Sequence, residues 1–378
     1  MLSVVQEMRV AFVYDAAYPW HVGGVEAMNY NEAKELAKDH EVHYFTMRWP
    51  GMRSDFSKNG VRYHASIRID QRRFYRKGKR STLQALAFSL DLFRIFNYDL
   101  DVIITNYFPI LHLPVLLLYC KIKRCKLVMQ VAEVWDREYW ISYLGGFRGA
   151  IANAYSSYLL RYADRYIANS SATAGKLRDF GIKDSVISVF SPILDDSIIS
   201  KVRGTGRSNT IVFSGRFVKE KRIDKWLGVF DAVRKKTNAK GLLIGSGPEE
   251  FAIREEMTRR GLSKSVTVRG FYHEKMALYR SLKSCAAMMN MSEREGLSII
   301  TLESLALGTP VFLPAGSPIP NEVKEMCVVD HDDRLPARIV NCIKSGKKGY
   351  IRHSENLEQF RVSRVREFYG RIFKLLWQ

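Results

Sequence analysis

Short apolar runs alternate along the chain with segments in which apolar residues recur at helical spacing. Runs of four to eight apolar residues are typical of strands buried on both faces of a parallel sheet. In the first half they predict strands at 9–14, 41–47, 61–65, 101–105, 126–131, 165–168 and 186–190. Helical spacing predicts helices at 27–38, 83–96 and 150–162. Strands that alternate with helices indicate an open α/β sheet.

The same rhythm restarts in the second half of the chain. It predicts strands at 210–214, 241–244, 265–269, 286–291, 310–313 and 327–329, and helices at 224–236, 249–260, 273–282 and 297–307. The polar, glycine-containing segment 201–209 suits a loop near a domain boundary. We therefore expect two doubly wound domains, residues 1–195 and 196–356, with ligand bound in the crevice at the carboxyl ends of the strands.

The composition of the chain indicates which binding partners and which cellular compartment to expect. The 378 residues carry a formal net charge of +20, which favours anionic partners: nucleotides, phospholipid surfaces, lipid phosphates or nucleic acid. The five cysteines are scattered and form no C-x-x-C pair, so we expect reduced thiols in the cytoplasm and neither a disulfide framework nor a zinc site. The first residues lack the basic start of a signal peptide. The longest apolar run, around 110–120, is shorter than the ~20 residues that span a bilayer.

The stretch 290–313 carries the candidate chemistry. It predicts a strand, a glycine turn, a helix and another strand, with Glu295 just before the helix and Glu303 inside it. The two carboxylates lie roughly 9 Å apart along the axis at ~1.5 Å per residue. Free N–H groups and the positive dipole end of the helix lie between them and suit a phosphate. The carboxylates could accept hydrogen bonds from sugar hydroxyls on either side, so the stretch fits a nucleotide-sugar.

This stretch resembles the signature of the retaining GT-B glycosyltransferases of family 4. The resemblance rests on Ser292 to Ser298, on the Glu-x7-Glu spacing, and on the tail Ala306-Leu-Gly-Thr-Pro310. The spacing alone would fit a surface helix with two ordinary glutamates. The resemblance implies an α/β GT-B fold, in which two Rossmann-like domains face a central cleft and a terminal helix, 357–378, packs back onto the first domain. It also implies sugar transfer from a nucleoside-diphosphate-sugar donor to a hydroxyl acceptor, without a metal or another cofactor.

The resemblance extends to the loops that follow three other strands of the second half. The family places an Arg and a Lys on the donor diphosphate, here Arg216 after Gly215, and Lys221. Two fixed cations would stabilise the charge that develops on the leaving group. The glycine that often follows this lysine is Arg222 here, which predicts a differently shaped loop. Gly247 lies in a Gly-x-Gly-Pro turn that the family places near the nucleoside, although a tight turn would explain it equally well.

The remaining donor roles also follow from the family. Glu303 would bind the ribose hydroxyls and Glu295 the sugar hydroxyls. The amides of Gly296, Leu297 and Ser298 would hold the phosphates. After the strand at 265–269, the family lets backbone groups read the base, so Phe271 and Tyr272 become candidates for the base pocket, with core packing as the alternative for Phe271.

The first half resembles the family less. The loop Pro19-Trp-His-Val-Gly-Gly-Val-Glu26 matches a family loop in which Gly23 and Gly24 would face the diphosphate and the acceptor; a plain turn is the alternative.

The acceptor side departs from the family, because Asn106 follows the strand at 101–105 where many members carry a histidine. Asparagine can bind a hydroxyl group but cannot exchange its proton. We expect His112 to be packed in a helix. Glu133 and Asp136 could orient or deprotonate the acceptor hydroxyl. We take Asp136 as the catalytic candidate on the acceptor side, together with Glu295, Arg216 and Lys221 on the donor side.

Two basic regions, Arg62–Arg80 and Lys121–Lys126, lie beside aromatic and aliphatic residues. They suit an anionic membrane surface, which would place the protein at the cytoplasmic membrane face with a saccharide or lipid-linked acceptor. A solvated loop is the alternative for 68–80. The sequence holds no recognised nucleic-acid motif.

The segment from Asp330 to Asp333 contains the Asp-x-Asp pattern of some metal sites. We interpret it as an exposed loop and expect no metal site. The alternative functions are a sugar-nucleotide epimerase and a basic nucleic-acid-binding protein.

Overall fold

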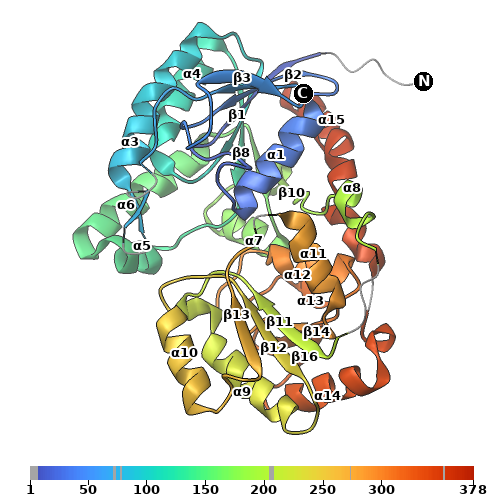
Figure 1. Ribbon diagram of the computed structural model, residues 1–378. Coiled ribbons are helices and arrows are strands. Elements are labelled where there is room, and N and C mark those ends of the chain that lie inside the picture. The colour runs from blue at the N-terminus through green and yellow to red at the C-terminus, as the bar shows by residue number, and fades with distance from the viewer. Residues whose placement is uncertain (1–6, 71–73, 77–78, 204–207, 273, 352–353) are drawn as a thin grey trace. The chain divides into compact units, whose positions relative to one another are not determined.

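The computed structural model describes residues 7–70, 74–76, 79–203, 208–272, 274–351 and 354–378. The chain divides into two compact units, Met1–Ile193 with Val362–Gln378, and Leu194–Arg361. Each unit is built on one main sheet of parallel strands with helices on both faces (Figure 1). The predicted two-domain α/β architecture is therefore confirmed.

The sheet of the first unit has the strand order β10-β9-β8-β7-β1-β2-β4-β3, and all its neighbours are parallel except β3 and β4. Its strands are β1 (Arg9–Val13), β2 (Glu41–Phe45), β3 (Asp55–Lys58), β4 (Val61–His64), β7 (Val102–Asn106), β8 (Lys126–Val131), β9 (Arg165–Ala168) and β10 (Ile187–Val189). A separate small ladder pairs β5 (Tyr75–Arg76) with β6 (Lys79–Arg80). The short antiparallel edge strand β3 was not predicted, because it is mostly exposed and lacks an apolar run.

The helices of this unit fall on the two faces of the sheet. They are α1 (Gly24–Leu36), α3 (Thr82–Asp91), α4 (Leu113–Lys123), α5 (Arg137–Leu144), α6 (Gly146–Leu159), α7 (Ser171–Asp179) and α15 (Val365–Leu376). Short 3-10 helices are η1 (Leu92–Asn97), η2 (Ile110–His112), η3 (Leu160–Tyr162), η4 (Asp184–Val186) and η8 (Val362–Arg364). Helices α1 and α15 pack together on one face, and α3, α4, α5 and α6 cover the other (Figure 1).

The terminal helix is shorter than predicted. Residues Ser354–Phe360 form 3-10 turns (η7) of the second unit, and the α-helix begins only at Val365. The carbonyl of Phe360 accepts a hydrogen bond from the amide of Leu194 at 2.9 Å, so it is not available to an amide four residues later. Helix α15 packs onto the first unit, where Phe368 stacks on Phe190 with the ring centroids 4.0 Å apart.

A buried polar network ties α15 to the sheet. The Gln130 side chain on β8 donates to the carboxyl of Glu32 on α1 and to the Tyr369 hydroxyl on α15, the latter at 3.0 Å. Its oxygen accepts from Asn106 at 3.0 Å, and Asn106 accepts from Asn29 at 2.6 Å. Burial raises the pKa of the fully buried Glu32 carboxyl to about 8, and the hydrogen bonds of Gln130 and Tyr369 only partly offset this. Glu32 is therefore protonated at neutral pH.

The sheet of the second unit has six parallel strands in the order β13-β12-β11-β14-β15-β16. They are β11 (Thr210–Ser214), β12 (Lys240–Ile244), β13 (Val266–Arg269), β14 (Ala287–Met289), β15 (Val311–Pro314) and β16 (Val328–Asp330), all at predicted positions within a few residues. Its helices are α8 (Asp196–Ile199), α9 (Ile223–Arg234), α10 (Glu250–Arg259), α11 (Lys275–Ser284), α12 (Ile299–Ala306), α13 (Asn321–Lys324) and α14 (Leu335–Ser345), with 3-10 turns η5 (Lys219–Lys221) and η6 (Lys347–Tyr350).

Each sheet has one point where the strand order reverses. In the first unit β1 lies between β2 and β7, and in the second β11 lies between β12 and β14. Neighbouring strands whose connections leave in opposite directions open a crevice at their carboxyl ends, where doubly wound sheets bind ligands. In the second unit, this position brings the loop after β11 beside the loop after β14.

The Glu32 network predicts a pH-dependent stability. The pKa of Glu32 is raised from 4.5 to about 8, so the folded chain keeps a proton that the unfolded chain releases above pH ~4.5. This contribution is complete below pH 4.5 and is lost as the pH rises towards 8, with a slope of up to about 1.4 kcal/mol per pH unit. Glu32→Gln, which mimics the protonated carboxyl, should remove this slope.

Urea unfolding followed by circular dichroism at pH 5, 6, 7 and 8 checks this prediction. The unfolding free energy of Glu32→Gln relative to wild type should rise steadily across the series. A difference that stays constant with pH would mean that Glu32 is ionised in the folded chain.

Candidate functional site

The loops 215–222 and 290–298 meet at the carboxyl ends of β11 and β14. The amide of Glu293 donates to the carbonyl of Glu220 at 2.8 Å. Lys221 Nζ lies 2.5 Å from Glu295 Oε1, and the two side chains are 20% and 12% exposed. Two predicted site residues 74 positions apart in the chain therefore form a partly buried ion pair.

Asn290 gives the loop after β14 its shape. Its side-chain oxygen accepts from the amide and the hydroxyl of Ser292 at 3.0 and 2.6 Å. Its amide group donates to Ser298 Oγ at 2.9 Å, and Ser298 Oγ also bonds to Thr301 Oγ1 at 2.8 Å. This buried asparagine links the end of β14 to the first turn of α12, which fixes where Glu295 lies.

The segment Gly296, Leu297 and Ser298 leads into α12. Within the described part of the chain, the amides of these three residues donate no hydrogen bond. Ser298 is in the left-handed region, with φ of 65°, and directly precedes the helix. Leu297 is buried, so only its backbone can reach a ligand. Unused amides at the positive end of a helix suit an anion.

Glu303 lies one and a half turns into α12 and is buried. Its Oε1 accepts from the Tyr279 hydroxyl at 2.7 Å and lies 3.1 Å from Lys275 Nζ. Lys275 and Tyr279 are one turn apart on α11, and the ammonium lies 5.3 Å from the centre of the tyrosine ring. Both residues were missed by the sequence reasoning, because an i, i+4 Lys–Tyr pair is common on any helix.

The two predicted phosphate cations differ in their surroundings. Arg216 is exposed, and its side chain has no hydrogen-bond or ion-pair partner among the residues that the structure describes. Lys221 is held by Glu295. One cation is therefore free, and the other is positioned in advance.

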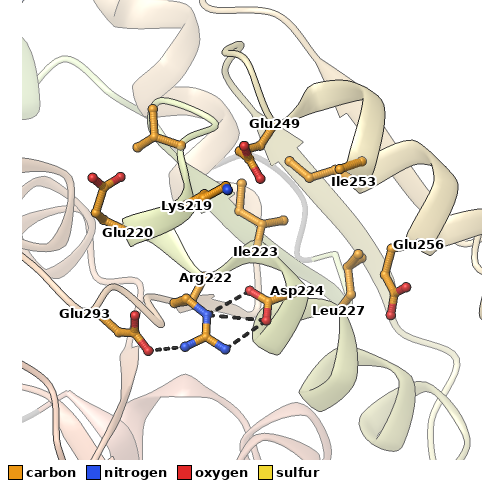
Figure 2. Close-up of a pocket in the computed structure, with 12 residues that line it drawn as sticks. Lys219, Glu220, Arg222, Ile223, Asp224, Leu227, Glu249, Ile253, Glu256 and Glu293 are labelled. Atoms are coloured by element: carbon orange, nitrogen blue, oxygen red, sulfur yellow. Dashed lines mark hydrogen bonds and ion pairs between the residues drawn. The ribbon is translucent and has the colours of Figure 1, made fainter. Parts of the chain in front are cut away.

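Arg222 occupies the position of the expected glycine and adopts a left-handed conformation, with φ of 47° and ψ of 49°. This is the region that glycine favours. The guanidinium bonds to both oxygens of Asp224 and to Glu293 (Figure 2). Arg222 thus takes a conformation that glycine favours, and two acids bind its side chain. The expectation of a differently shaped loop stays a prediction.

Gly247 lies where two loops cross. The Phe217 amide donates to the Ser246 carbonyl at 2.8 Å, and the Glu249 amide donates to the Phe217 carbonyl at 3.0 Å. A Cβ added to Gly247 would collide with the Phe217 carbonyl oxygen and approach the Phe217 nitrogen to 2.8 Å. The glycine therefore lets the loop after β12 pack closely against the loop after β11. This close packing agrees with the alternative explanation of Gly247 as part of a tight turn.

Phe271 and Tyr272 follow β13 at the edge of the sheet. Phe271 is 50% exposed, so the alternative that it packs in the core is wrong. The Arg269 guanidinium lies 4.4 Å from the centre of the Tyr272 ring. An exposed phenyl ring near a cation-supported tyrosine could stack on a base.

In the first unit, Gly23 is the N-cap of α1 and Gly24 its first residue. A Cβ on Gly23 would meet the carboxylate of Glu26, with the Glu26 Cδ only 2.9 Å away. Glu26 is buried and lies 2.8 Å from His21 Nδ1. Gly23 thus leaves room for a His–Glu pair that the sequence reasoning did not identify.

The predicted acceptor-side residues each have a partner of their own. Asn106 is buried in the network described above. Glu133 accepts a hydrogen bond from the Trp135 indole at 3.0 Å. Asp136 is the N-cap of α5 and accepts from the Tyr139 amide at 2.8 Å. His112 lies in η2, bonded to Thr105 at 2.7 Å, and burial lowers its pKa to about 4.

In the second unit, a pocket of about 480 Å³ opens between the loop 218–222 and helices α9 and α10 (Figure 2). Its lining combines apolar side chains with charged ones, most of which are acidic. The lining residues are Val218, Lys219, Glu220, Arg222, Ile223, Asp224, Leu227, Glu249, Ala252, Ile253, Glu256 and Glu293. None of the predicted donor residues lines it, so the pocket is separate from the candidate site.

The other sequence expectations concern metals, thiols and membrane spans. No three metal-binding side chains converge among the described residues. Asp330 ends β16 and bonds to Arg338 at 2.9 Å. The five cysteines, all within the described ranges, are not joined in disulfides. Within the described ranges, none of the helices has the length and apolarity needed to cross a bilayer.

Comparison with known families assigns both halves of the chain. Residues 22–197 match the family described as Glycosyltransferase Family 4, and residues 195–328 match the family described as Glycosyl transferases group 1. The chain is a family 4-type glycosyltransferase of the GT-B fold. No protein of curated function matches this glycosyltransferase in sequence.

Solved structures show the fold of this glycosyltransferase over nearly its whole length. HepE from Anabaena, in complex with UDP and glucose, is 15% identical, with 97% of this chain and 100% of that chain covered and a TM-score of 0.69. Sucrose-phosphate synthase from Thermosynechococcus elongatus is 16% identical, with 98% and 99% covered and a TM-score of 0.72. The lipopolysaccharide outer core galactosyltransferase WaaB is 17% identical, with 97% and 99% covered and a TM-score of 0.66.

The close backbone crossing at Gly247 predicts a local cost of substitution. Gly247→Ala should lower the unfolding free energy by about 1–3 kcal/mol, because the added methyl group overlaps the Phe217 backbone. Gly228→Ala in α9, where the added carbon would approach only the flexible Arg260 side chain, should instead stabilise by roughly 0.5–1 kcal/mol. Urea unfolding of both variants gives the comparison. Equal changes in unfolding free energy for the two variants would contradict the close contact between Gly247 and the Phe217 backbone.

Proposed function

We propose that this glycosyltransferase moves a sugar from a nucleoside-diphosphate-sugar donor to a hydroxyl group of a saccharide or lipid-linked acceptor, with retention of configuration and without a metal. The observation that carries the proposal is the Lys221–Glu295 pair beside the unused amides of Gly296 to Ser298. A cation, an acid and a helix N-terminus at one strand end match the charges of a sugar diphosphate.

In this proposal the diphosphate binds to Arg216, Lys221 and the amides that precede α12. Negative charge develops on the departing phosphate, and preorganised cations and N–H groups stabilise it more in the transition state than in the ground state. Arg216 is exposed and unpaired within the described part of the chain, so it can turn to the phosphate without breaking an ion pair. These groups could do the work that a divalent cation does in other transferases, which is why we propose a metal-independent reaction.

Each of the two glutamates would bind one end of the donor. Glu303 is held by Tyr279 and Lys275 and would accept hydrogen bonds from the ribose. Glu295 would accept hydrogen bonds from the transferred sugar while Lys221 turns to the phosphate. Phe271 would stack on the base, with Tyr272 beside it.

Retention is proposed from the family. The acceptor then attacks the face from which the diphosphate leaves, so a phosphate oxygen can take the acceptor proton. Asp136 is proposed as the residue that orients the acceptor, with Glu133 three positions before it in the chain and Asn106 at the end of β7. Asp136 is exposed, and its capping bond uses only one carboxylate oxygen.

A lipid-linked acceptor would lie at a membrane. Part of the predicted cationic surface is already neutralised: Arg62 pairs with Glu41, and Arg80 turns inward to the buried Asp15. Lys123 and Lys126 pair with Asp99 and Asp164. The exposed Arg68, Lys121 and Arg124 remain to face anionic lipid, and residues 71–73 and 77–78 lie outside the described residues.

The donor site predicts a specific loss in one lysine variant. Lys221→Ala should lower kcat by about 10²–10³, because a positioned transition-state donor is removed, and should weaken binding of UDP or another nucleoside diphosphate. Lys225→Ala is the matched control, since this half-exposed lysine lies in the next helix and contacts acids only at 3.7 and 3.9 Å. It should keep wild-type kcat.

Sugar transfer and a thermal-shift series with UDP-, GDP- and ADP-sugars provide the measurements. Turnover by Lys221→Ala at the rate of Lys225→Ala would remove this assignment. Conversion of the donor with no acceptor present would instead indicate an epimerase. Loss of activity in EDTA that added Mg²⁺ restores would contradict metal independence.

A further inference from the structure

The first unit exposes an unusual concentration of large apolar side chains on one face. The helices α3, α4 and α6 and the turns η1 and η3 carry them, as Leu83, Leu86, Leu90, Phe93, Leu118, Ile122, Phe147, Ile151, Tyr158 and Tyr162. We call this set the α3–α4–α6 face. In the described part of the second unit, the large apolar side chains that are similarly exposed are Phe251, Phe271 and Val329.

The three helices form one continuous layer on the sheet. Helix α4 contacts η1 and η2, and α3 contacts both of these turns. The core residues of α4 pack with α3 and η1 on one side, and those of η2 and α4 pack with α5 and α6 on the other. Leu117 contacts both core clusters. The same layer is seen in Figure 1, on the face opposite α1 and α15.

The apolar positions follow helix geometry, so on each helix they share one side. On α6 and η3 the exposed residues recur at 147, 151, 158 and 162, and on α3 at 83, 86 and 90. These spacings place the side chains on one stripe of each helix. Phe147 is 81% exposed and Leu83 is 75% exposed. An ordinary surface helix would carry polar side chains along such a stripe.

The charged side chains exposed on these three helices are cations. Segment 145–163 contains no aspartate or glutamate, and its exposed charges are Arg148 and Arg161. Helix α4 ends with the exposed Lys121 and with Lys123, which pairs with Asp99 at 2.8 Å, and the exposed Arg124 follows. The one acid on α3, Asp91, is half-buried beside Arg94, with 3.3 Å between the charged groups.

We propose that the α3–α4–α6 face binds the surface of a bilayer that contains anionic lipids. Leucine, isoleucine and phenylalanine side chains would enter the acyl boundary, and the tyrosines and cations would lie among the headgroups. This inference deepens the proposed function, on which it rests for its purpose, because it brings the acceptor-binding unit to the membrane that would hold a lipid-linked acceptor. In this proposal the α3–α4–α6 face, and not the Arg62–Arg80 segment, makes the main contact with the membrane.

The composition of the face favours lipid over other partners. Nucleic acid would require cations without the leucine stripe of α3, since leucine side chains gain nothing from a phosphate backbone. A second copy of this chain would bring Arg148, Arg161 and Lys121 against the same cations, because the exposed acids next to the face, Asp99 and Asp164, already pair with Lys123 and Lys126. An anionic bilayer satisfies both the apolar and the cationic side chains.

Co-sedimentation with vesicles tests the proposal on the full chain. Phosphatidylcholine vesicles with about 30% phosphatidylglycerol should bind the wild type at low salt, and pure phosphatidylcholine vesicles should bind it much less. Phe147→Ser with Ile151→Ser should weaken binding at least tenfold, since each buried side chain contributes on the order of a tenfold gain. Lys121→Gln should weaken it only at low salt.

Phe251→Ser is the control, because Phe251 is 74% exposed in α10 of the second unit; it should leave vesicle binding unchanged. No binding to anionic vesicles, or equal losses in both serine variants, would overturn the proposal. So would a dimer in analytical ultracentrifugation that Phe147→Ser with Ile151→Ser dissociates, or oligonucleotide binding tighter than vesicle binding. Vesicle binding needs no donor, so its failure leaves the Lys221 test of sugar transfer intact.

Discussion

The ion pair between Lys221 and Glu295 is the interaction on which the candidate donor site depends. It joins the loops after β11 and β14, which no covalent constraint holds together. Both side chains are mostly buried, so water screens their attraction little. The pair positions a cation and an acid at the start of α12 before any donor arrives. A diphosphate can then attract Lys221 while Glu295 becomes available to a sugar hydroxyl.

The position of this site could be predicted from sequence because two simple patterns coincide there. Buried parallel strands are continuous apolar runs, so β11 and β14 were located within a few residues. Parallel strands end at the same edge of a sheet, so loops after neighbouring strands must meet. Arg222 shows the limit of matching by residue type: this arginine adopts the left-handed conformation that glycine favours, and Asp224 and Glu293 bind its side chain.

Contacts between distant segments could not be predicted in the same way. Lys275 and Tyr279 support Glu303 only because α11 packs beside α12. Arg80 counted as a surface cation in the sequence, yet the buried Asp15 draws it inward. Asp136 was chosen for its chemistry and also serves as a helix cap. The terminal helix begins late because Leu194 binds the Phe360 carbonyl. In each case the deciding partner is remote in sequence and has no pattern of its own.

A crystal structure of the protein with a bound nucleoside-diphosphate-sugar tests the central claim most directly. The account predicts diphosphate oxygens within hydrogen-bond distance of Arg216, Lys221 and the amides of Gly296 to Ser298. It also predicts ribose hydroxyls on Glu303 and sugar hydroxyls on Glu295. A nucleotide bound elsewhere, with the Lys221–Glu295 pair unchanged and those amides free of ligand, would contradict it.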